Sequence, residues 1–242
     1  MGKVNAMKEN YQKILDEMIA GLEEKGEVPK LLLHSCCAPC SSYVLEYLSN
    51  YFYITVLYYN PNIYPEDEYY HRAAEQKRFI KEFPTKYPVT YVEGNFEPER
   101  FYETVKGYEN IWEGGERCFR CYELRLREAA EYAKKLNCDY FTTTLSISPM
   151  KNAAKLNEIG GRLAEEYGIP YLYSDFKKRD GYKRSTVISA EYGMYRQDYC
   201  GWGVFEGGGG GEGYCGCVFS KREREEQKRE RAAQKSEQSV QE

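Results

Sequence analysis

Three cysteines stand close together in the segment CCAPC, as Cys36, Cys37 and Cys40. Neighbouring side chains on an extended backbone point in opposite directions. The thiolates of Cys36 and Cys37 therefore suit a multi-iron cluster, in which each can bind a different iron, better than a single zinc, on which both sulfurs would have to converge. The segment predicts a metal-binding loop, in which Cys40 is either a third thiol near the metal or a part of the turn.

A second pair of cysteines, Cys118 and Cys121, has the C-x-x-C spacing. By itself this spacing fits a zinc site, a dithiol or an iron–sulfur cluster. Together with Cys36 and Cys37 it supplies the four thiolates that hold a [4Fe-4S] cluster. The alternative is a closed zinc site that only staples the fold.

A third group of thiols lies late in the sequence, where Cys215 and Cys217 flank Gly216 and Cys200 stands upstream. A disulfide between residues this close in sequence closes a very small ring and is strained. Strain raises the reduction potential of a disulfide and makes the bond labile. We therefore interpret Cys215 and Cys217 as a redox-active pair, and the alternative is a pair of free or metal-binding thiols.

A basic segment at residues 176–185 interleaves positive charge with aromatic rings. Phosphate contacts combined with base stacking are the means by which proteins hold single-stranded RNA loops. The alternative is a solvated surface loop. The residues that we expect to contact RNA are Lys177, Lys178, Arg179, Tyr182, Lys183 and Arg184.

The hydropathy pattern predicts the elements that must position these residues. Short apolar runs alternate with segments of helical periodicity, which is typical of an α/β fold with a parallel sheet and flanking helices. Ligands of such sheets bind beyond the carboxyl ends of the strands, and the CCAPC loop follows the first strand. His34 ends that strand, and we expect it to be a hydrogen-bonded core residue rather than a ligand. The predicted strands cover residues 30–35, 53–59, 88–92, 140–145 and 169–173, and the predicted helices cover residues 5–25, 41–47 (capped by Ser41 and Ser42), 66–82, 121–136 and 151–167.

Length, charge and composition bound the class of protein. The 242 residues carry a net charge of −4, which argues against a general nucleic-acid coat but allows a local basic patch. The sequence shows neither an apolar run of transmembrane length nor the apolar core of a signal peptide, so we expect a cytoplasmic protein with no membrane partner. Nine cysteines in that reducing compartment favour metal or redox chemistry over structural disulfides. We divide the chain into an N-terminal helix (1–28), a single α/β catalytic domain (29–222) with a glycine-rich insertion (202–216), and a charged tail (223–242).

Several longer motifs extend these local patterns: LLLHSCCAPCSS, YYNPNIYP, GGERCFRCYELRL, FTTTLSISPMKN, SDFKKRDGYKRS and YRQDYCG with CVFSKRE. Together they resemble the epoxyqueuosine reductase family of the QueH type. The resemblance covers about residues 30–222 and leaves the first helix and the charged tail outside. With it we expect a HUP-like, nucleotide-hydrolase-type layer sandwich.

The resemblance implies the last step of queuosine formation in tRNA. The wobble base of the anticodon carries an epoxycyclopentane ring, and the enzyme removes the epoxide oxygen as water with two electrons and two protons. The resemblance also implies a [4Fe-4S] cluster on Cys36, Cys37, Cys118 and Cys121, and a redox-active disulfide at the C-G-C pair. The resemblance further implies an additional iron ion beside the cluster, and Cys40 is a candidate ligand to this ion.

One departure from the family pattern concerns the partner of Cys217. The family pattern YRQDYCGC is uninterrupted, whereas fifteen extra residues, 202–216, precede Cys217 in this chain. Tyr-Cys-Gly occurs on both sides of these residues, so either Cys200 or Cys215 is the partner. Cys215 keeps the C-G-C spacing, which favours it. Cys200 keeps the upstream motif, and a glycine-rich insertion there costs little additional loop-closure entropy.

These expectations combine into a mechanism. tRNA carrying epoxyqueuosine docks on the basic segment, its wobble base is splayed toward the cluster, and an external electron donor supplies the electrons. The leaving oxygen needs a proton, for which Asp175 and Asp198 are the candidate acids, unless a Lewis-acidic iron serves instead. The competing interpretations are a zinc-stapled tRNA-binding module, a general dithiol oxidoreductase and a tRNA sulfur-transfer enzyme. The last of these would need a phosphate-binding loop at a position where Pro39 removes a backbone donor.

Overall fold

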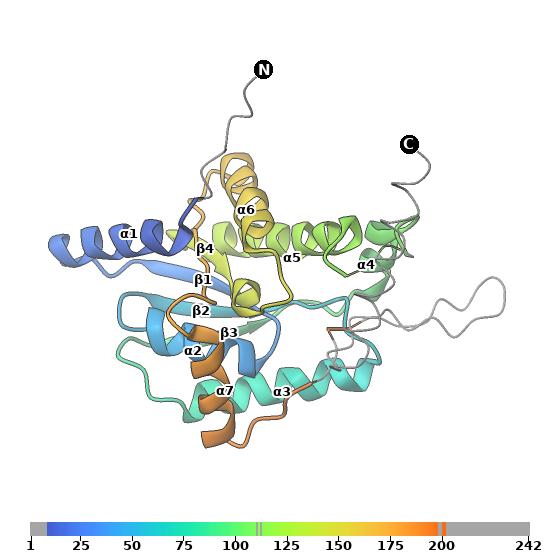
Figure 1. Cartoon of the computed structure of the whole chain (residues 1–242), viewed down its shortest axis with the longest axis horizontal. Helices are drawn as coiled ribbons and strands as arrows, with labels where there is room; N and C mark the ends of the chain where they lie inside the picture. The colour runs from blue at the N-terminus through green and yellow to red at the C-terminus, as the bar shows by residue number, and fades with distance from the viewer. Residues whose placement is uncertain (1–8, 110, 112, 198–199, 202–242) are drawn as a thin grey trace, which may run out of the picture.

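The computed structural model describes residues 9–109, 111, 113–197 and 200–201, and it shows a parallel sheet between two layers of helices (Figure 1). The predicted α/β class is therefore confirmed, and the arrangement is compatible with a HUP-like layer sandwich. The strands are β1 (Lys30–Ser35), β2 (Tyr53–Tyr58), β3 (Val89–Glu93) and β4 (Tyr140–Thr143). The helices are α1 (Tyr11–Lys25), α2 (Ala38–Leu48), α3 (Glu66–Glu82), α4 (Pro98–Val105), α5 (Glu116–Lys135), α6 (Ala153–Tyr167) and α7 (Gly181–Glu191), with a 3-10 helix, η1 (Thr144–Ile147), after β4.

The sheet has the order β3-β2-β1-β4, and all of its strands run parallel. The register aligns the carboxyl ends of the three strands that matter for the site, because His34 of β1 pairs with Leu57 of β2 and with Thr143 of β4. The loops that follow these strands therefore emerge side by side. We call this side of the sheet the carboxyl edge.

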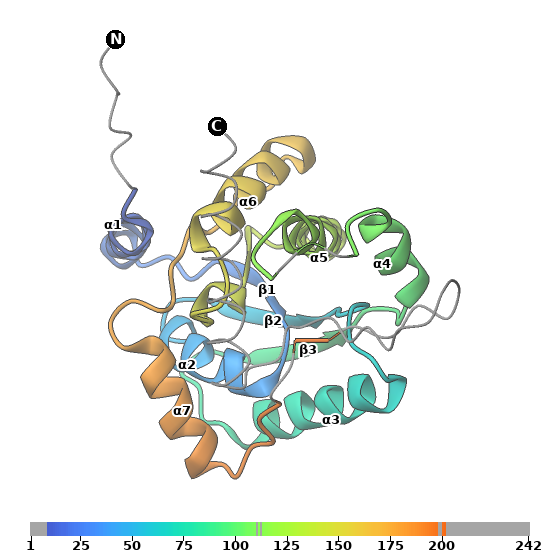
Figure 2. The same ribbon diagram turned by 45° about the vertical axis from the view of Figure 1, so that its right-hand side comes forward.

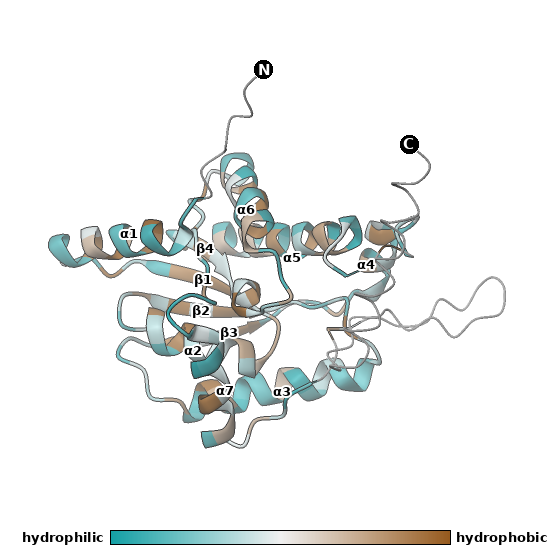
Figure 3. Ribbon diagram, in the orientation of Figure 1, coloured by the Kyte–Doolittle hydropathy of each residue, from teal (hydrophilic) through white to brown (hydrophobic). Residues whose placement is uncertain are grey.

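Helices cover both faces of the sheet at β1, which explains why the sequence of β1 is a continuous apolar run rather than an alternating one. Leu31 and Leu33 pack with apolar side chains of α1, α2, α3 and α7, whereas Leu32 packs with those of α4, α5 and α6. Figure 2 shows α4, α5 and α6 on one side of the sheet and α2, α3 and α7 on the other, and Figure 3 shows the apolar strands between them.

His34 confirms the prediction of a buried, hydrogen-bonded residue. Its side chain is 0% exposed, and its Nε2 lies 3.0 Å from the carbonyl oxygen of Tyr59, while Nδ1 lies 2.8 Å from Thr143 Oγ1. A carbonyl can only accept, so Nε2 carries the proton and Nδ1 accepts from the threonine hydroxyl. This neutral imidazole joins the segments that leave β1, β2 and β4.

The predicted strand at residues 169–173 is wrong. In the structure this segment makes one isolated parallel bridge, between Phe141 and Tyr171. Two backbone hydrogen bonds support it, from Phe141 to Pro170 and from Leu172 to Phe141. The ladder does not extend because β4 ends at Thr143 and the chain turns into η1, which removes the partner that further pairing would need.

Several helix boundaries also differ from the prediction. α2 begins at Ala38, with Cys37 as its N-cap, and Ser41 and Ser42 lie inside the helix, where their hydroxyls donate to Ala38 and Pro39 carbonyls. Proline is favoured in the first turn of a helix, which accounts for the earlier start. α4 and α7 were not predicted as helices.

The helices in the described part of the chain include none that is long and apolar enough to cross a membrane. α1 packs onto the main sheet through Leu15, Ile19 and Leu22. The predicted boundaries at residues 28/29 and 222/223 stay predictions. The insertion and the charged tail lie outside the described residues.

Candidate metal and substrate site

The CCAPC loop lies at the carboxyl edge, in the turn from β1 into α2. Cys36 Sγ lies 3.8 Å from Cys37 Sγ, and the sulfurs of Cys36, Cys37 and Cys40 all lie within 4.8 Å of one another. The expectation that the two vicinal side chains diverge is therefore wrong, because the chain bends at Cys36 instead of staying extended. The helical turn that begins directly after Cys37 then brings Cys40 to the same group. Sulfurs on one tetrahedral ion, at about 2.3 Å from the metal, lie about 3.8 Å apart. The three thiols are thus grouped as metal ligands would be.

Buried polar contacts fix this loop in place. Asn60 Nδ2 donates to the carbonyl oxygen of Ser35 at 2.9 Å, and Ser35 Oγ donates to Gln76 Oε1 at 2.7 Å. Asn60 follows β2 and Gln76 belongs to α3, so elements on either side of the loop hold it. Such support pre-organises the thiols that the loop carries.

Hydrogen bonds among the three sulfurs favour ionisation of Cys37. Hydrogen bonds with Cys36 and Cys40 hold the pKa of Cys37 well below its ordinary value. The same contact with Cys37 raises the pKa of Cys36 to about 11, and hydrogen bonds with Cys36 and Cys37 raise that of Cys40 well above its ordinary value. Cys37 also lies at the N-terminus of α2, where the helix dipole favours negative charge. The thiolate is the form that binds a metal.

The C-x-x-C pair lies on the first two turns of α5, which begins at Glu116 rather than near Cys121 as predicted. The three-residue spacing puts Cys118 and Cys121 on one face of the helix. Gly114, with a φ of +85°, makes the turn into the helix, and its N–H donates to Cys118 Sγ at 3.3 Å. Both thiols are buried, and burial raises the pKa of Cys121 to about 11.

Arg125 lies between the two cysteine motifs, one turn after Cys121 on α5. Its side chain is 1% exposed, its Nε donates to the Cys121 carbonyl at 3.2 Å, and its Nη1 lies 3.5 Å from Asn60 Oδ1. Burial opposes the charge, but the nearby sulfurs of Cys121, Cys200 and Cys36 outweigh that effect and raise the pKa of Arg125 above its ordinary value. One guanidinium therefore interacts with thiols of all three cysteine-bearing segments.

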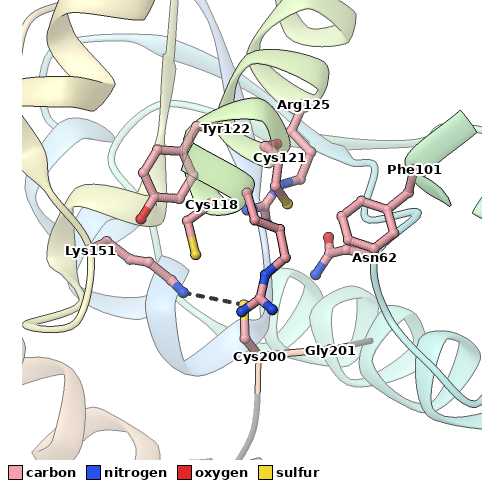
Figure 4. A pocket seen from close by; sticks show the side chains of 10 residues that line it. Asn62, Phe101, Cys118, Cys121, Tyr122, Arg125, Lys151, Cys200 and Gly201 are labelled. Atoms are coloured by element: carbon pink, nitrogen blue, oxygen red, sulfur yellow. Dashed lines mark hydrogen bonds between the residues drawn. The ribbon is translucent and has the colours of Figure 1, made fainter. Parts of the chain in front are cut away.

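Cys200 closes the site from the third segment. Its Sγ accepts from Lys151 Nζ at 3.3 Å, and Lys151 Nζ also lies 3.4 Å from Glu113 Oε1 (Figure 4). Arg72 Nη1 donates to the carbonyl oxygen of Cys200 at 3.1 Å. Lys151 and Arg72 are both buried, so Cys200 is anchored through its backbone and its sulfur.

The residue after Cys200 shows how closely this segment is seated. Gly201 has a φ of +138°, and a Cβ built there would lie 2.4 Å from the backbone oxygen of Asn62. Real Cβ atoms are essentially never found so close to another atom, so this position requires glycine. The Cys200-Gly201 step thus rests directly on the turn that follows β2.

The start of α5 encloses a small pocket at the carboxyl edge together with the segments that carry Asn62, Lys151 and Cys200, and Figure 4 shows this pocket from close by. Lys151 presents its amino nitrogen to the Cys200 sulfur there, and the rings of Phe101 and Tyr122 form walls. The residues lining the pocket are Asn62, Phe101, Arg117, Cys118, Cys121, Tyr122, Arg125, Lys151, Cys200 and Gly201.

Sequence analysis identified the thiols of this site but missed Asn62, Arg125 and Lys151. Asn62 lies in the turn after β2 and Lys151 follows η1, so the rule that sites form at strand ends could have identified both. Arg125 stands four residues after Cys121 on a predicted helix, a spacing that places the two on one face.

The basic segment predicted to bind RNA is partly engaged within the protein. Lys177 Nζ donates to the Ser146 carbonyl at 2.9 Å and pairs with Asp175 at 3.0 Å. Arg179 pairs with Asp16 of α1, and Arg184 with Glu46 of α2. Lys178, Tyr182 and Lys183 are exposed, the last two on the first turn of α7. The segment is thus half loop and half helix, and RNA contact by these residues stays a prediction.

The remaining predicted residues lie away from the pocket or outside the described residues. Asp175 is not among the residues that line the pocket. Asp198, Cys215 and Cys217 lie outside the part of the chain that the structure describes.

Thiols from three segments, gathered at the carboxyl edge of a parallel sheet and surrounded by buried cations, define an α/β protein with a cysteine-based strand-end site. Comparison with known proteins identifies its family. The family model described as Epoxyqueuosine reductase QueH matches residues 31–205. This chain belongs to the epoxyqueuosine reductase QueH family.

Individual relatives agree over most of their length. The epoxyqueuosine reductase QueH of Staphylococcus epidermidis is 43% identical over 205 residues, which are 83% of this chain and 86% of the relative. The protein of the same name from Streptococcus pyogenes is 42% identical over 79% of this chain and 76% of its own length. That of Thermotoga maritima is 34% identical over 81% of this chain and 92% of its own length.

Proposed function

We propose that this chain reduces epoxyqueuosine to queuosine at the wobble position of tRNA. The epoxide oxygen leaves as water, the two ring carbons that held it become an alkene, and two electrons and two protons are consumed. Family membership supports the reaction, and the structural observation that carries it is the pocket in which Cys118 and Cys121 of α5 meet Cys200 and the buried Arg125.

The donor set consists of thiols alone, which is the chemistry that iron–sulfur centres use, while the 3.8 Å spacing of the Cys36 and Cys37 sulfurs also suits a single ion. Cys36 and Cys37 from the β1 loop, with Cys118 and Cys121 from α5, would hold a [4Fe-4S] cluster, and the grouping of Cys40 with the first two thiols supports it as a ligand to an additional iron ion. When bound, such a centre supplies single electrons to a substrate. The buried positive charge of Arg125 favours an anionic thiolate centre at this place.

Cys200 is the thiol of the C-terminal segment that the described contacts support as part of the site. Lys151 favours its thiolate form, and Arg72 and Gly201 fix its backbone. We propose that Cys200 works beside the cluster, either as the redox partner of Cys217 or next to the alternative pair of Cys215 and Cys217.

We propose that Lys151 offers an N–H donor toward the pocket, where the leaving oxygen needs a proton. Lys178, Tyr182 and Lys183 are exposed for contact with the anticodon loop. We propose that the enzyme works in the cytoplasm with an external electron donor.

The test is nucleoside analysis of tRNA from cells that lack other epoxyqueuosine reductases, with and without this gene. Queuosine should replace epoxyqueuosine when the gene is present, and persisting epoxyqueuosine would refute the reaction. Anaerobically purified protein should be brown and should contain iron with acid-labile sulfide. A colourless protein with stoichiometric zinc would instead support a zinc-stapled RNA-binding module.

A further inference from the structure

Arg125 carries a buried charge that its protein contacts do not balance. Its side chain is 1% exposed, and its two hydrogen-bond acceptors, the Cys121 carbonyl and Asn60 Oδ1, are both neutral. Among the described residues, no ion pair joins Arg125 to a carboxylate within 4.0 Å. An uncompensated guanidinium in a protein interior is strongly unfavourable, so an anion is expected beside it.

Two other buried cations of the site show the contrast. Arg72 pairs with Glu68 at 2.6 Å, and Lys151 pairs with Glu113 at 3.4 Å. Both of these carboxylates are also shielded from solvent, with side-chain exposures of 13% and 6%. The structure therefore provides carboxylate partners for Arg72 and Lys151, whereas Arg125 contacts only the neutral Cys121 carbonyl and Asn60 amide among the described residues, in a pocket that Cys118, Cys121 and Cys200 also line.

The position of Arg125 on α5 suits a charge that acts on the whole centre. It follows Cys121 by four residues, so both side chains lie on the same face of the helix. The thiols that interact with its charge are Cys121, Cys200 and Cys36, which belong to α5, the C-terminal segment and the β1 loop. Loss of this one charge would therefore change the electrostatic potential at thiols on both sides of the proposed cluster.

We propose that Arg125 is a positioning residue whose fixed positive charge balances the thiolate centre and sets its reduction potential. The inference rests on the proposed iron–sulfur function. A cluster held by four thiolates is a net anion that becomes more negative when it gains an electron. A nearby fixed cation therefore stabilises the reduced form more than the oxidised form, and burial leaves this interaction poorly screened by salt.

The test is a potentiometric titration of the cluster-loaded protein, followed by electron paramagnetic resonance, in the absence of tRNA. In Arg125→Gln the ratio of reduced to oxidised cluster at a fixed solution potential should fall by about tenfold, which for a one-electron couple is about 59 mV toward more negative potential. Arg125→Lys retains the charge and should titrate close to the wild type. Arg127→Gln is the matched control, because Arg127 lies on the same helix but pairs with Glu123 and Glu166.

An unchanged potential in Arg125→Gln, with iron content equal to that of the wild type, would overturn the proposal. If Arg125→Gln does not retain its cluster, Asn60→Asp provides the second test, because it places a carboxylate beside Nη1 and neutralises the guanidinium without removing it. That variant should also titrate at more negative potential, and a wild-type value there would reduce Arg125 to a structural role. An iron–sulfur protein that fails to act on epoxyqueuosine would refute the proposed function and leave this test intact.

Discussion

Acidification should destabilise the protein through His34, the neutral histidine that joins the ends of three strands. Burial, followed by the positive charge of Arg125, lowers the pKa of His34 from 6.5 to about 4. In the unfolded chain the imidazole is solvated and protonates near its ordinary pKa of about 6.5. The folded state therefore binds this proton later than the unfolded state as the pH falls.

The sign and the size of the effect follow from linkage. Because the folded pKa lies below the unfolded one, the contribution of His34 is complete above about pH 6.5 and is lost as the pH falls toward about 4. The whole interval corresponds to about 3 kcal/mol of unfolding free energy, of which about 2 kcal/mol is lost between about pH 7 and about pH 5. This is a large fraction of the stability of an ordinary domain.

Urea unfolding of the wild type and of His34→Gln across this pH range measures the effect. The glutamine amide can still donate to the Tyr59 carbonyl but does not titrate, so the stability of the variant should fall with acid by about 2 kcal/mol less than that of the wild type. His71→Gln is the control, because His71 is the second histidine and is exposed. Parallel pH profiles for the wild type and His34→Gln would refute the reasoning.

Three further outcomes are expected. Gly201→Ala should lower turnover about tenfold, because strain of about 1–3 kcal/mol would displace Cys200, whereas Gly168→Ala, which also has a positive φ but open space around the new Cβ, should lower only the melting temperature, by a few degrees. Replacing Lys178 and Lys183 by Gln should weaken tRNA binding and reduce the salt dependence of log K by roughly 1.5 in slope, as filter binding at several salt concentrations would show. Removal of the metal with a chelator under anaerobic, reducing conditions should lower the melting temperature, because the gathered thiols lose the ion that holds them, and calorimetry before and after reconstitution checks this.

Local signals in the sequence were sufficient where an element is defined by its own residues. The strand at residues 30–35 and the helix at residues 66–82 have the bounds that were predicted. The predicted strand at residues 169–173 failed for a nonlocal reason, since its apolar pattern is real but β4 leaves the sheet before a ladder can form. Pairing depends on where a distant segment ends, which a local pattern does not contain.

The residues of the site also divide into those that the local sequence predicts and those that depend on distant contacts. The cysteines were recognisable from their chemistry, because residue type and spacing are both local. Their convergence depends on the register of β1 against β2 and on the path of α5, and the neighbours that tune them, Asn60 and Arg125, arrive through those contacts. The partners of Arg179 and Arg184, which are Asp16 and Glu46, lie more than a hundred residues away in sequence, so the internal pairing of the basic segment was hidden as well.

The duplicated Tyr-Cys-Gly motif shows what the contacts add to a sequence comparison. Spacing alone favoured Cys215, because it stands two residues before Cys217. In the first copy, however, the surrounding structure constrains both Cys200 and Gly201. Lys151 contacts the Cys200 sulfur, and the Asn62 backbone excludes a Cβ at Gly201. Cys215 could occupy this position in the site only if Cys200 left it. Cys200→Ala should therefore lower epoxyqueuosine reduction more than Cys215→Ala does, and the reverse order in nucleoside analysis would show that the seated thiol is not the working one.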